Sequence, residues 1–157
     1  MTDFSALYKK YAPDVFRFAL YLSGDRSQAE DITSETFVRA WTSPEPIEVA
    51  TVKGYLFTIA RNLFLHALRR KSRHVQLDRE LPDPQASPYL QAEQKEEFRA
   101  LLLGLQELPE IARSALLMRA VDGMPYEEIS RALGVSLASA KVKIHRARLA
   151  LAGIRHG

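Results

Sequence analysis

The sequence predicts an all-α protein made of two small helical domains that are joined by a flexible linker. Apolar residues recur every three to four positions through most of the chain, which is the period of an amphipathic helix. Glycine and proline interrupt this pattern at intervals and predict the corners between helices. Residues 75–88 contain acids and three prolines with little periodicity, so this stretch predicts the linker. With 46% apolar residues among 157, the chain can bury a core.

Before the linker, the spacing predicts helices over residues 4–22 and 27–41, joined by a Ser-Gly-Asp corner at 23–25. Pro13 interrupts the first segment and predicts a break there, or the first turn of a second helix. A further helix is expected from about Val52 to Arg73, after a loop from Thr42 to Ala50 that contains two prolines. The N-terminal domain is thus expected to be helical apart from its connections.

The helix expected over residues 27–41 has two chemically different faces. One face carries a stripe predicted to face the core, made of Ala29, Ile32, Thr33, Phe37 and Ala40. On the other side Asp31 and Glu35 lie one helical turn apart, beside the apolar Val38. Such carboxylates are simply solvated in most helices. The more specific interpretation is a docking face for a basic protein partner.

The helix expected from Val52 to Arg73 also presents two lines of side chains. Its core stripe is predicted to be Val52, Leu56, Ile59, Ala60, Leu63 and Ala67. The other side offers aromatic, amide and guanidinium groups, which suit a single strand of nucleic acid because they combine stacking with phosphate neutralisation. The residues on or beside this line are Tyr55, Thr58, Arg61, Asn62, Leu65, Arg69 and Arg70. The alternative is an ordinary core helix whose aromatic rings pack on neighbours.

After the linker, four helices are expected, over residues 89–108, 111–121, 126–132 and from 136 onward. Glu127 and Glu128 are interpreted as the charged first turn of the third. Gly134 predicts the next corner because glycine tolerates the left-handed backbone that ends a helix, and Ser136 then predicts an N-cap. The core stripe of the last helix is predicted to be Ala140, Ile144, Ala147 and Leu151.

The last two of these helices form a predicted helix-turn-helix with a basic outer face. No acidic residue occurs from Ser136 to the C-terminus, so nothing in this segment offsets its positive charge. A basic helix after a tight corner is the arrangement that reads the major groove of DNA. The alternative is an ordinary helical hairpin whose basic face is solvated.

Charge is distributed unevenly along the chain, although the net charge is only +3. Residues 25–48 hold six acids and two bases, whereas residues 61–74 hold five bases and no acid. This alternation suits a protein that touches DNA with some faces and a basic protein partner with another.

Several classes of function receive no support from the composition. The absence of cysteine excludes disulfides, thiolate metal sites and thiol redox switches. The four histidines, at positions 66, 74, 145 and 156, lack metal-ligand spacing, and no nucleophile has an evident base. We therefore expect no catalytic residue, metal or cofactor. No apolar run reaches membrane-spanning length and the N-terminus lacks a signal-peptide core, so we expect a cytoplasmic protein without stable membrane insertion.

Three segments, in this order, resemble the extracytoplasmic-function (ECF) sigma factors of bacterial RNA polymerase. They are AEDITSETFVRAW at 29–41, YLFTIARNLFLHALRR at 55–70 and LPEIARSALLMRAVDGMPYEEISRALGVSLASAKVKIHRAR at 108–148. The resemblance covers nearly the whole chain, and three ordered motifs are more specific than a helix-turn-helix alone. It implies a sigma-2 domain over residues 1–74, a linker over 75–88 and a sigma-4 domain over 89–157.

The resemblance also implies a partner for each face. The beta-prime clamp of core RNA polymerase would contact Asp31, Glu35 and Val38. The minus-10 promoter element would be read and melted by Tyr55, Thr58, Arg61, Asn62, Leu65, Arg69 and Arg70. The minus-35 element would be read by Ser136, Ser139, Lys141, Val142, Lys143, His145, Arg146 and Arg148. The polymerase beta flap and an anti-sigma protein are further implied partners.

The chain departs from the family pattern at four positions. Ser34 stands where glutamine is usual, and Tyr55 where tryptophan is common. Ala138 and Val142 stand where small polar residues and glycine are usual, so the promoter sequence does not carry over from the family. The runner-up interpretation is a stand-alone helix-turn-helix regulator, which would need neither the acidic face nor the aromatic helix.

Overall fold

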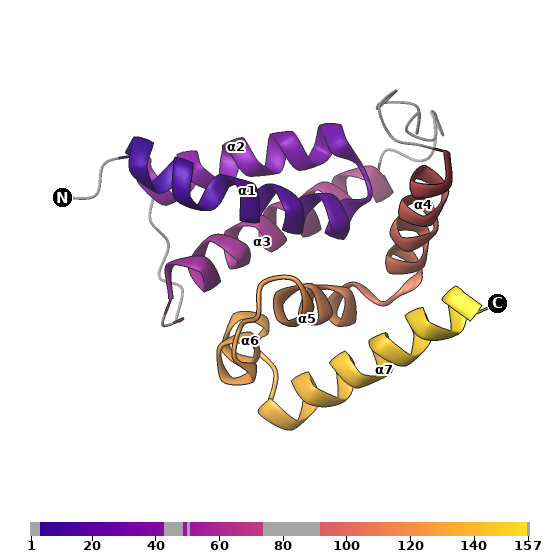
Figure 1. Ribbon diagram of the computed structural model, residues 1–157. Coiled ribbons are helices and arrows are strands. Elements are labelled where there is room, and N and C mark those ends of the chain that lie inside the picture. The colour runs from indigo at the N-terminus through magenta and orange to yellow at the C-terminus, as the bar shows by residue number, and fades with distance from the viewer. Residues whose placement is uncertain (1–3, 43–48, 50, 74–91, 157) are drawn as a thin grey trace.

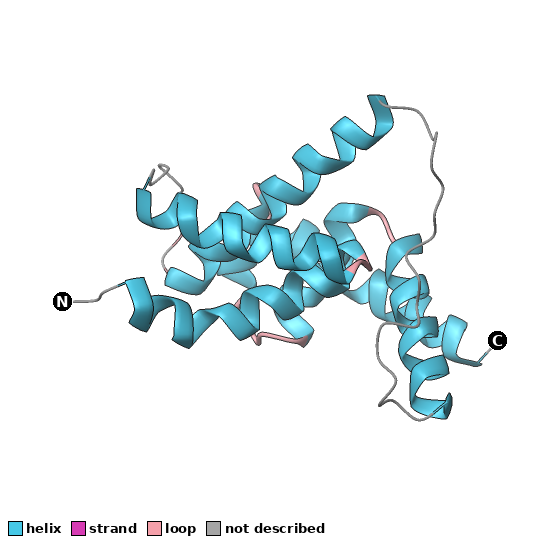
Figure 2. Ribbon diagram, turned by 90° about the horizontal axis from the view of Figure 1, so that it is seen from above, coloured by secondary structure: helices cyan, strands magenta, loops and turns pink. Residues whose placement is uncertain are grey.

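The computed structural model describes residues 4–42, 49, 51–73 and 92–156, and all regular structure in these ranges is helical (Figures 1 and 2). The helices are α1 (Phe4–Ser23), α2 (Arg26–Thr42), α3 (Val52–Arg73), α4 (Ala92–Glu107), α5 (Glu110–Ala120), α6 (Tyr126–Leu133) and α7 (Leu137–His156). The all-α prediction is confirmed. The predicted linker at 75–88 and most of the predicted loop at 42–50 lie outside the described residues.

Helices α1, α2 and α3 pack together and form the upper layer of Figure 1. The rings of Phe18 from α1 and Phe57 from α3 stack at the centre, with centroids 4.6 Å apart and planes 4° from parallel. The predicted stripe of α2 is buried except at Ala40, which is half-buried, and Thr36 joins it. Its hydroxyl donates to the Ile32 carbonyl, 2.6 Å away, so burial leaves no unpaired hydroxyl there.

Two local predictions in this half are wrong. Helix α1 is continuous through Pro13, which lies on its exposed side. There the Lys9 carbonyl, which loses its helical donor to the proline ring, is within reach of water. Val52 was predicted to be buried but is 47% exposed, because it is the first residue of α3 and lies at the edge of the core rather than within it. Phe64 is buried in the core and was not predicted to be.

The turn between α6 and α7 has the predicted geometry. Gly134 adopts the left-handed backbone, with φ of 67°, and the Val135 amide donates back to the Ser130 carbonyl at 3.1 Å. Ser136 then accepts a hydrogen bond from the Ser139 amide at 3.1 Å. Both the corner and the N-cap are thus confirmed, and they set the direction of α7.

The two helical halves pack on each other rather than standing apart. Helix α1 contacts α4 and α5, and α3 contacts α6. A single hydrophobic cluster contains residues of both halves, with Phe18, Leu22 and Phe64 on one side and Leu105 and Met118 on the other. Burial of apolar surface across this boundary stabilises the packed arrangement.

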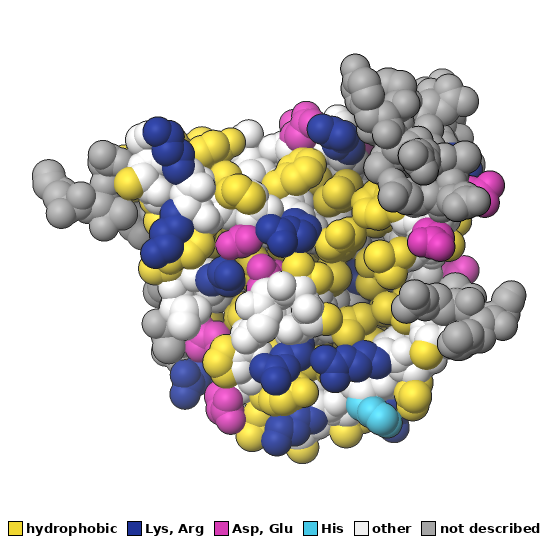
Figure 3. Space-filling view, in the orientation of Figure 1, with side chains coloured by type: hydrophobic (Ala, Val, Ile, Leu, Met, Phe, Trp, Pro, Cys, Tyr) yellow, Lys and Arg dark blue, Asp and Glu magenta, His cyan; other side chains and the backbone are white. Residues whose placement is uncertain are grey.

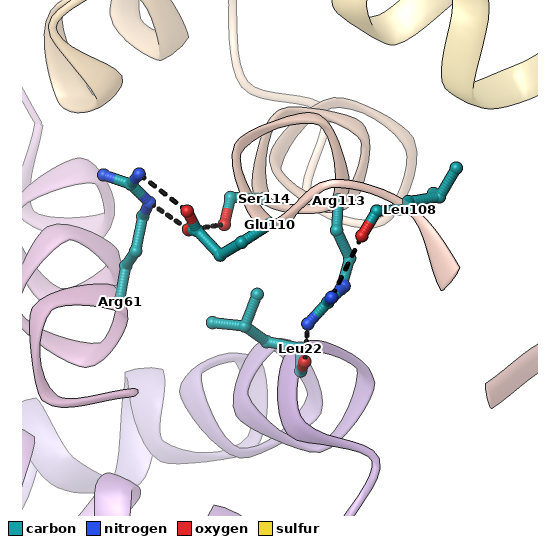
Figure 4. Close-up of polar contacts among 6 residues, drawn as sticks. All are labelled: Leu22, Arg61, Leu108, Glu110, Arg113 and Ser114. Atoms are coloured by element: carbon teal, nitrogen blue, oxygen red, sulfur yellow. Dashed lines mark hydrogen bonds and ion pairs between the residues drawn. The ribbon is translucent and has the colours of Figure 1, made fainter. Parts of the chain in front are cut away.

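Arg113 of α5 joins the halves through its guanidinium (Figure 4). It is 7% exposed and donates to the backbone carbonyl of Leu22, at the end of α1, at 2.6 Å. It also donates to three carbonyls around the end of α4, those of Leu105, Gln106 and Leu108. Burial lowers the pKa of Arg113 from its ordinary value, an effect that the nearby Glu110 opposes. Carbonyls at helix ends lack helical partners, so one buried cation satisfies several orphan groups at once.

We predict that Arg113→Met lowers the free energy of unfolding by about 2–4 kcal/mol, because hydrogen bonds from a charged group are worth about 1.5–3 kcal/mol each. Methionine keeps the apolar stem and leaves the carbonyl groups without their donor. Urea denaturation followed by circular dichroism measures the change. The control is Arg26→Met, an exposed residue on α2, which should stay within about 0.5 kcal/mol of the wild type. An equal midpoint for both variants would contradict this role.

Candidate nucleic-acid interface

Helix α7 presents a basic surface to solvent. Its predicted core residues Ala140, Ile144 and Ala147 are no more than 2% exposed, so the opposite side faces outward. Dark-blue lysine and arginine side chains lie along α7 at the bottom of Figure 3. The predicted minus-35 residues that are exposed are Ser136, Lys141, Val142, His145, Arg146 and Arg148. The other two, Ser139 and Lys143, are half-buried.

The ring of Tyr126, on α6, contacts two cations at this surface. The Arg119 guanidinium lies 4.4 Å from the centroid of its ring, and the Lys141 ammonium lies 5.5 Å from it. Cations over the face of an aromatic ring are attracted by its quadrupole, which orients Lys141 without neutralising its charge. No local sequence pattern indicates this contact, because its three residues come from α5, α6 and α7.

The predicted docking face on α2 is also open to solvent. Asp31 and Glu35 are exposed, and Val38 is 48% exposed. Glu35 forms an ion pair with Arg39, one turn further on, with 3.2 Å between nitrogen and oxygen. An exposed pair of this kind is worth only about 0.2–1 kcal/mol, so Glu35 can exchange this partner for a cation of another protein.

An aromatic cluster missed by the sequence analysis lies at the end of α2. Phe4 of α1 meets Trp41 edge to face, with centroids 5.6 Å apart, and Tyr8 meets Phe37 at 5.0 Å. Phe4, Tyr8 and Trp41 are 36–49% exposed, although large aromatic rings are mostly buried. Exposed aromatic rings beside a charged face are typical of protein-binding surfaces. The cluster forms only when the first turns of α1 reach the last turn of α2.

The fold exposes some of the predicted minus-10 residues on α3 and partly buries the others. Asn62, Arg69 and Arg70 are exposed, as the prediction requires. Tyr55, Thr58, Arg61 and Leu65 are half-buried. Arg61 does not extend into solvent but donates to both carboxylate oxygens of Glu110 on α5 (Figure 4). The structure therefore brings only part of the line to the surface.

Glu127 and Glu128 lie in the first turn of α6, as predicted, but Glu128 is buried. Its side chain is 4% exposed, and one carboxylate oxygen accepts from both the amide and the hydroxyl of Thr51 at 3.0 Å each. Thr51 immediately precedes α3, so Glu128 ties α6 to the start of that helix. Its neighbour Glu127 is exposed, as expected for the first turn of a surface helix.

Asp122, between α5 and α6, is a buried carboxylate at the same boundary. Its side chain is 2% exposed, and one oxygen lies 3.9 Å from the Lys53 ammonium of α3. The other oxygen has no hydrogen-bond partner among the described residues. Burial raises the pKa of Asp122 to about 6, Lys53 opposes this rise, and the charge of Asp14 adds to it. Burying a carboxylate with one unpaired oxygen costs free energy.

The described residues hold neither a candidate metal site nor a membrane-spanning helix. No group of three or more histidine, aspartate or glutamate side chains there could hold a metal ion. None of the described helices combines the length and the apolar character needed to cross a membrane.

Comparisons with known proteins assign the family. The family models for Sigma-70 region 2 and Sigma-70, region 4 match residues 7–74 and 98–151. The ECF RNA polymerase sigma factor SigM of Bacillus subtilis is 34% identical over 148 residues, which cover 90% of this chain and 88% of SigM. The chain belongs to the ECF sigma factors. The ECF sigma factor SigE of Mycolicibacterium smegmatis is 33% identical over 154 residues, and this chain spans 60% of its length.

Solved structures show the same fold. The sigma factor RpoE of Bartonella quintana, in complex with the anti-sigma factor NepR, superposes with a TM-score of 0.80 at 24% identity, over 99% of this chain and 98% of RpoE. CnrH, in complex with the cytosolic domain of CnrY, superposes with a TM-score of 0.71 at 21% identity, over 98% of this chain and 87% of CnrH. The arrangement of the described helices in this ECF sigma factor is therefore a known one.

We predict that Asp122→Asn stabilises the protein at pH 8, because the amide carries no charge to desolvate. The pKa of about 6 in the folded protein lies above the ordinary value near 3.8, so the folded state binds more protons between these values. Wild-type stability from this group therefore increases as the pH falls through 6, and the advantage of the variant shrinks toward pH 4. Urea denaturation across this range measures both. The exposed Glu107→Gln is the control, and a variant less stable than wild type at pH 8 would contradict the account.

Proposed function

We propose that this ECF sigma factor binds core RNA polymerase, gives it promoter specificity and helps to open the duplex, without catalysing a reaction itself. The observation that carries the proposal is the exposed basic face of α7. This helix follows the turn at Gly134 that ends α6, and it contains no acidic residue. A helix of this kind fits the major groove and neutralises phosphates at its edges. The protein works in the cytoplasm, where RNA polymerase transcribes.

In this proposal, α7 reads the minus-35 element. Lys141 and Arg146 contact both bases and phosphates, Ser139 and His145 contact base edges, and Arg148 contacts mainly phosphate. The remaining contacts come from Ser136, Val142 and Lys143. The exposed positions of six of these eight residues support the assignment.

The N-terminal half, residues 1–74, would act as the sigma-2 domain and residues 89–157 as the sigma-4 domain, joined by a linker at 75–88. The two family-model matches, at 7–74 and 98–151, support this division. The line on α3 would hold the melted minus-10 strand, because stacking on aromatic rings acts only on unpaired bases. Asn62, Arg69 and Arg70 are exposed and within reach of such a strand.

Three protein contacts complete the proposal. The clamp of the polymerase beta-prime subunit would dock on Asp31, Glu35 and Val38, beside the aromatic cluster of Phe4 and Trp41. The beta flap would contact the sigma-4 domain. An anti-sigma protein is the expected regulator, because the sigma factor RpoE, which has the same fold, was solved in complex with the anti-sigma factor NepR.

A stand-alone helix-turn-helix regulator was the runner-up interpretation. It would explain α7 but not the Sigma-70 region 2 match over residues 7–74 or the exposed acidic face of α2. The deciding experiment adds the purified protein to core RNA polymerase and maps which genomic DNA becomes transcribed. New start sites that share an upstream and a minus-10 element support the sigma role. DNA binding without any core-dependent initiation would instead favour the regulator.

We predict that Lys141→Ala and Arg146→Ala each weaken binding of the holoenzyme to a promoter found in this way. Loss of a base-reading side chain should cost about 1–3 kcal/mol and relax the sequence requirement at one position, while loss of a phosphate contact should reduce the salt slope. Competition binding at several salt concentrations separates the two effects. Arg26→Ala removes one exposed charge from α2 and should leave binding unaltered. Unchanged affinity of both α7 variants at every salt concentration would rule out the assignment.

We predict that the double variant Asp31→Lys/Glu35→Lys loses association with core polymerase while its circular dichroism stays helical. Both side chains are exposed, so reversing their charge repels a basic partner without disturbing the core. Co-purification with core polymerase is the measurement. The control Glu96→Lys/Glu97→Lys makes the same change of charge on α4. Retained co-purification of the α2 variant would show that this face is not the dock.

A further inference from the structure

The solvent-facing side of α7 carries apolar side chains among its cations. Leu137, Ala138, Val142 and Leu149 are all exposed, with Val142 at 45% and Leu149 at 59%. In Figure 3, yellow apolar surface lies among the dark-blue lysine and arginine side chains at the bottom of the molecule. Single exposed apolar residues are common on protein surfaces, so the positions of these residues around the helix decide whether they form a site.

Val142 lies at the centre of the outward side of α7. It comes two residues after Ala140 and two before Ile144, and a helix turns by about 100° per residue, so Val142 points away from both of these buried residues. Ala138, one turn earlier, and Leu149, two turns later, lie on the same side. The outermost line of α7 is therefore apolar rather than basic.

Polar and cationic side chains flank this apolar line. His145 and Arg146 follow Val142 by three and four residues, so they lie on either side of it, and both are exposed. Duplex DNA fits such a surface, because phosphates border the major groove and base edges form its floor. A second apolar protein surface would also cover the line, but it would offer no anion to Lys141 and Arg146.

A valine that faces base edges can recognise only one chemical group there. Its side chain has neither a donor nor an acceptor, so it forms no hydrogen bond with any base. The apolar group that the major groove presents is the C5 methyl of thymine. Contact with a polar base edge would remove water from that edge without replacing its hydrogen bond, which costs free energy. Contact with thymine instead removes apolar surface of both partners from water.

We propose that Val142 determines promoter specificity by packing against the C5 methyl group of a thymine in the minus-35 element. This inference rests on the proposed function of α7 as the helix that reads this element. Lys141 and Arg146 hold the helix in the groove, and Val142 adds a base preference that needs no hydrogen bond. The family pattern has small polar residues or glycine at this part of the helix, so the preference belongs to this chain.

Replacement of thymine by deoxyuridine tests this contact, because it removes the C5 methyl group and leaves base pairing in place. The holoenzyme, made from the full chain and core polymerase, is bound to duplexes that carry a minus-35 element found by the transcription mapping. Each thymine of the element, on either strand, is replaced in turn. We expect one position at which the replacement raises the Kd about fourfold, as for the loss of one buried apolar carbon.

The test variant is Val142→Ser, which removes the apolar contact. Serine and valine have similar helix propensities and the position is exposed, so α7 should stay folded, as circular dichroism can check. In this variant the Kd should be the same with thymine and with deoxyuridine at the sensitive position. The matched control is Leu149→Ser, on the same side of α7. Leu149 lies about 10 Å further along the axis, beyond the first turns that contact base edges, so the control should keep the fourfold difference.

A methyl-sensitive position that disappears in Val142→Ser and persists in Leu149→Ser supports the proposal. A minus-35 element without thymine, or a holoenzyme that tolerates every replacement, would overturn it. Equal sensitivity of the wild type and Val142→Ser would also overturn it, because another residue would then contact the methyl group. Loss of co-purification with core polymerase in Val142→Ser would assign the apolar line to a protein contact instead. Failure of the proposed sigma function itself would show separately, as absence of core-dependent initiation by the wild type.

Discussion

The buried guanidinium of Arg113 is the constraint on which the arrangement of the helices depends. The position of this guanidinium is narrowly constrained, because its N–H groups must reach carbonyl oxygens at the ends of both α1 and α4. A buried cation without these partners would cost far more than its packing returns. The ring of Phe64 lies 5.8 Å from the guanidinium and adds a contact from α3. Once Arg113 has formed these hydrogen bonds, α5 is fixed against the N-terminal helices. The positions of α6 and α7 then follow from the position of α5.

This placement gives the functional faces different exposure. The acidic face of α2 and the basic face of α7 remain in solvent, whereas part of the α3 line is covered. The difference follows from charge: α5 and α6 carry carboxylates such as Glu110 and Glu128 that can meet α3, and α7 carries none. Under the proposed function, the acidic face of α2 is open to its partner without any change of structure, whereas Arg61 on the α3 line is already bound to Glu110.

Local physics explains what the sequence determined by itself. Helix positions follow from the spacing of apolar residues within each segment, and α2, α3, α5 and α6 begin and end within one residue of their predicted bounds. The corner at Gly134 and the cap at Ser136 depend on residues no more than five positions apart. The outer face of α7 follows from the same periodicity, and the three motifs identified the family.

Only the tertiary structure decided which predicted surfaces are open. Periodicity places Arg61 opposite the core stripe of α3, but it cannot show that Glu110, 49 residues later, fills the space beside it. Glu128 has the sequence context of an ordinary first turn, and its burial depends on Gly54 in another helix. The local sequence does not distinguish Arg113 from a surface arginine. Its buried position depends on carbonyl groups at the ends of α1 and α4. Each of these roles needs a partner from a distant segment, and no local pattern encodes that partner.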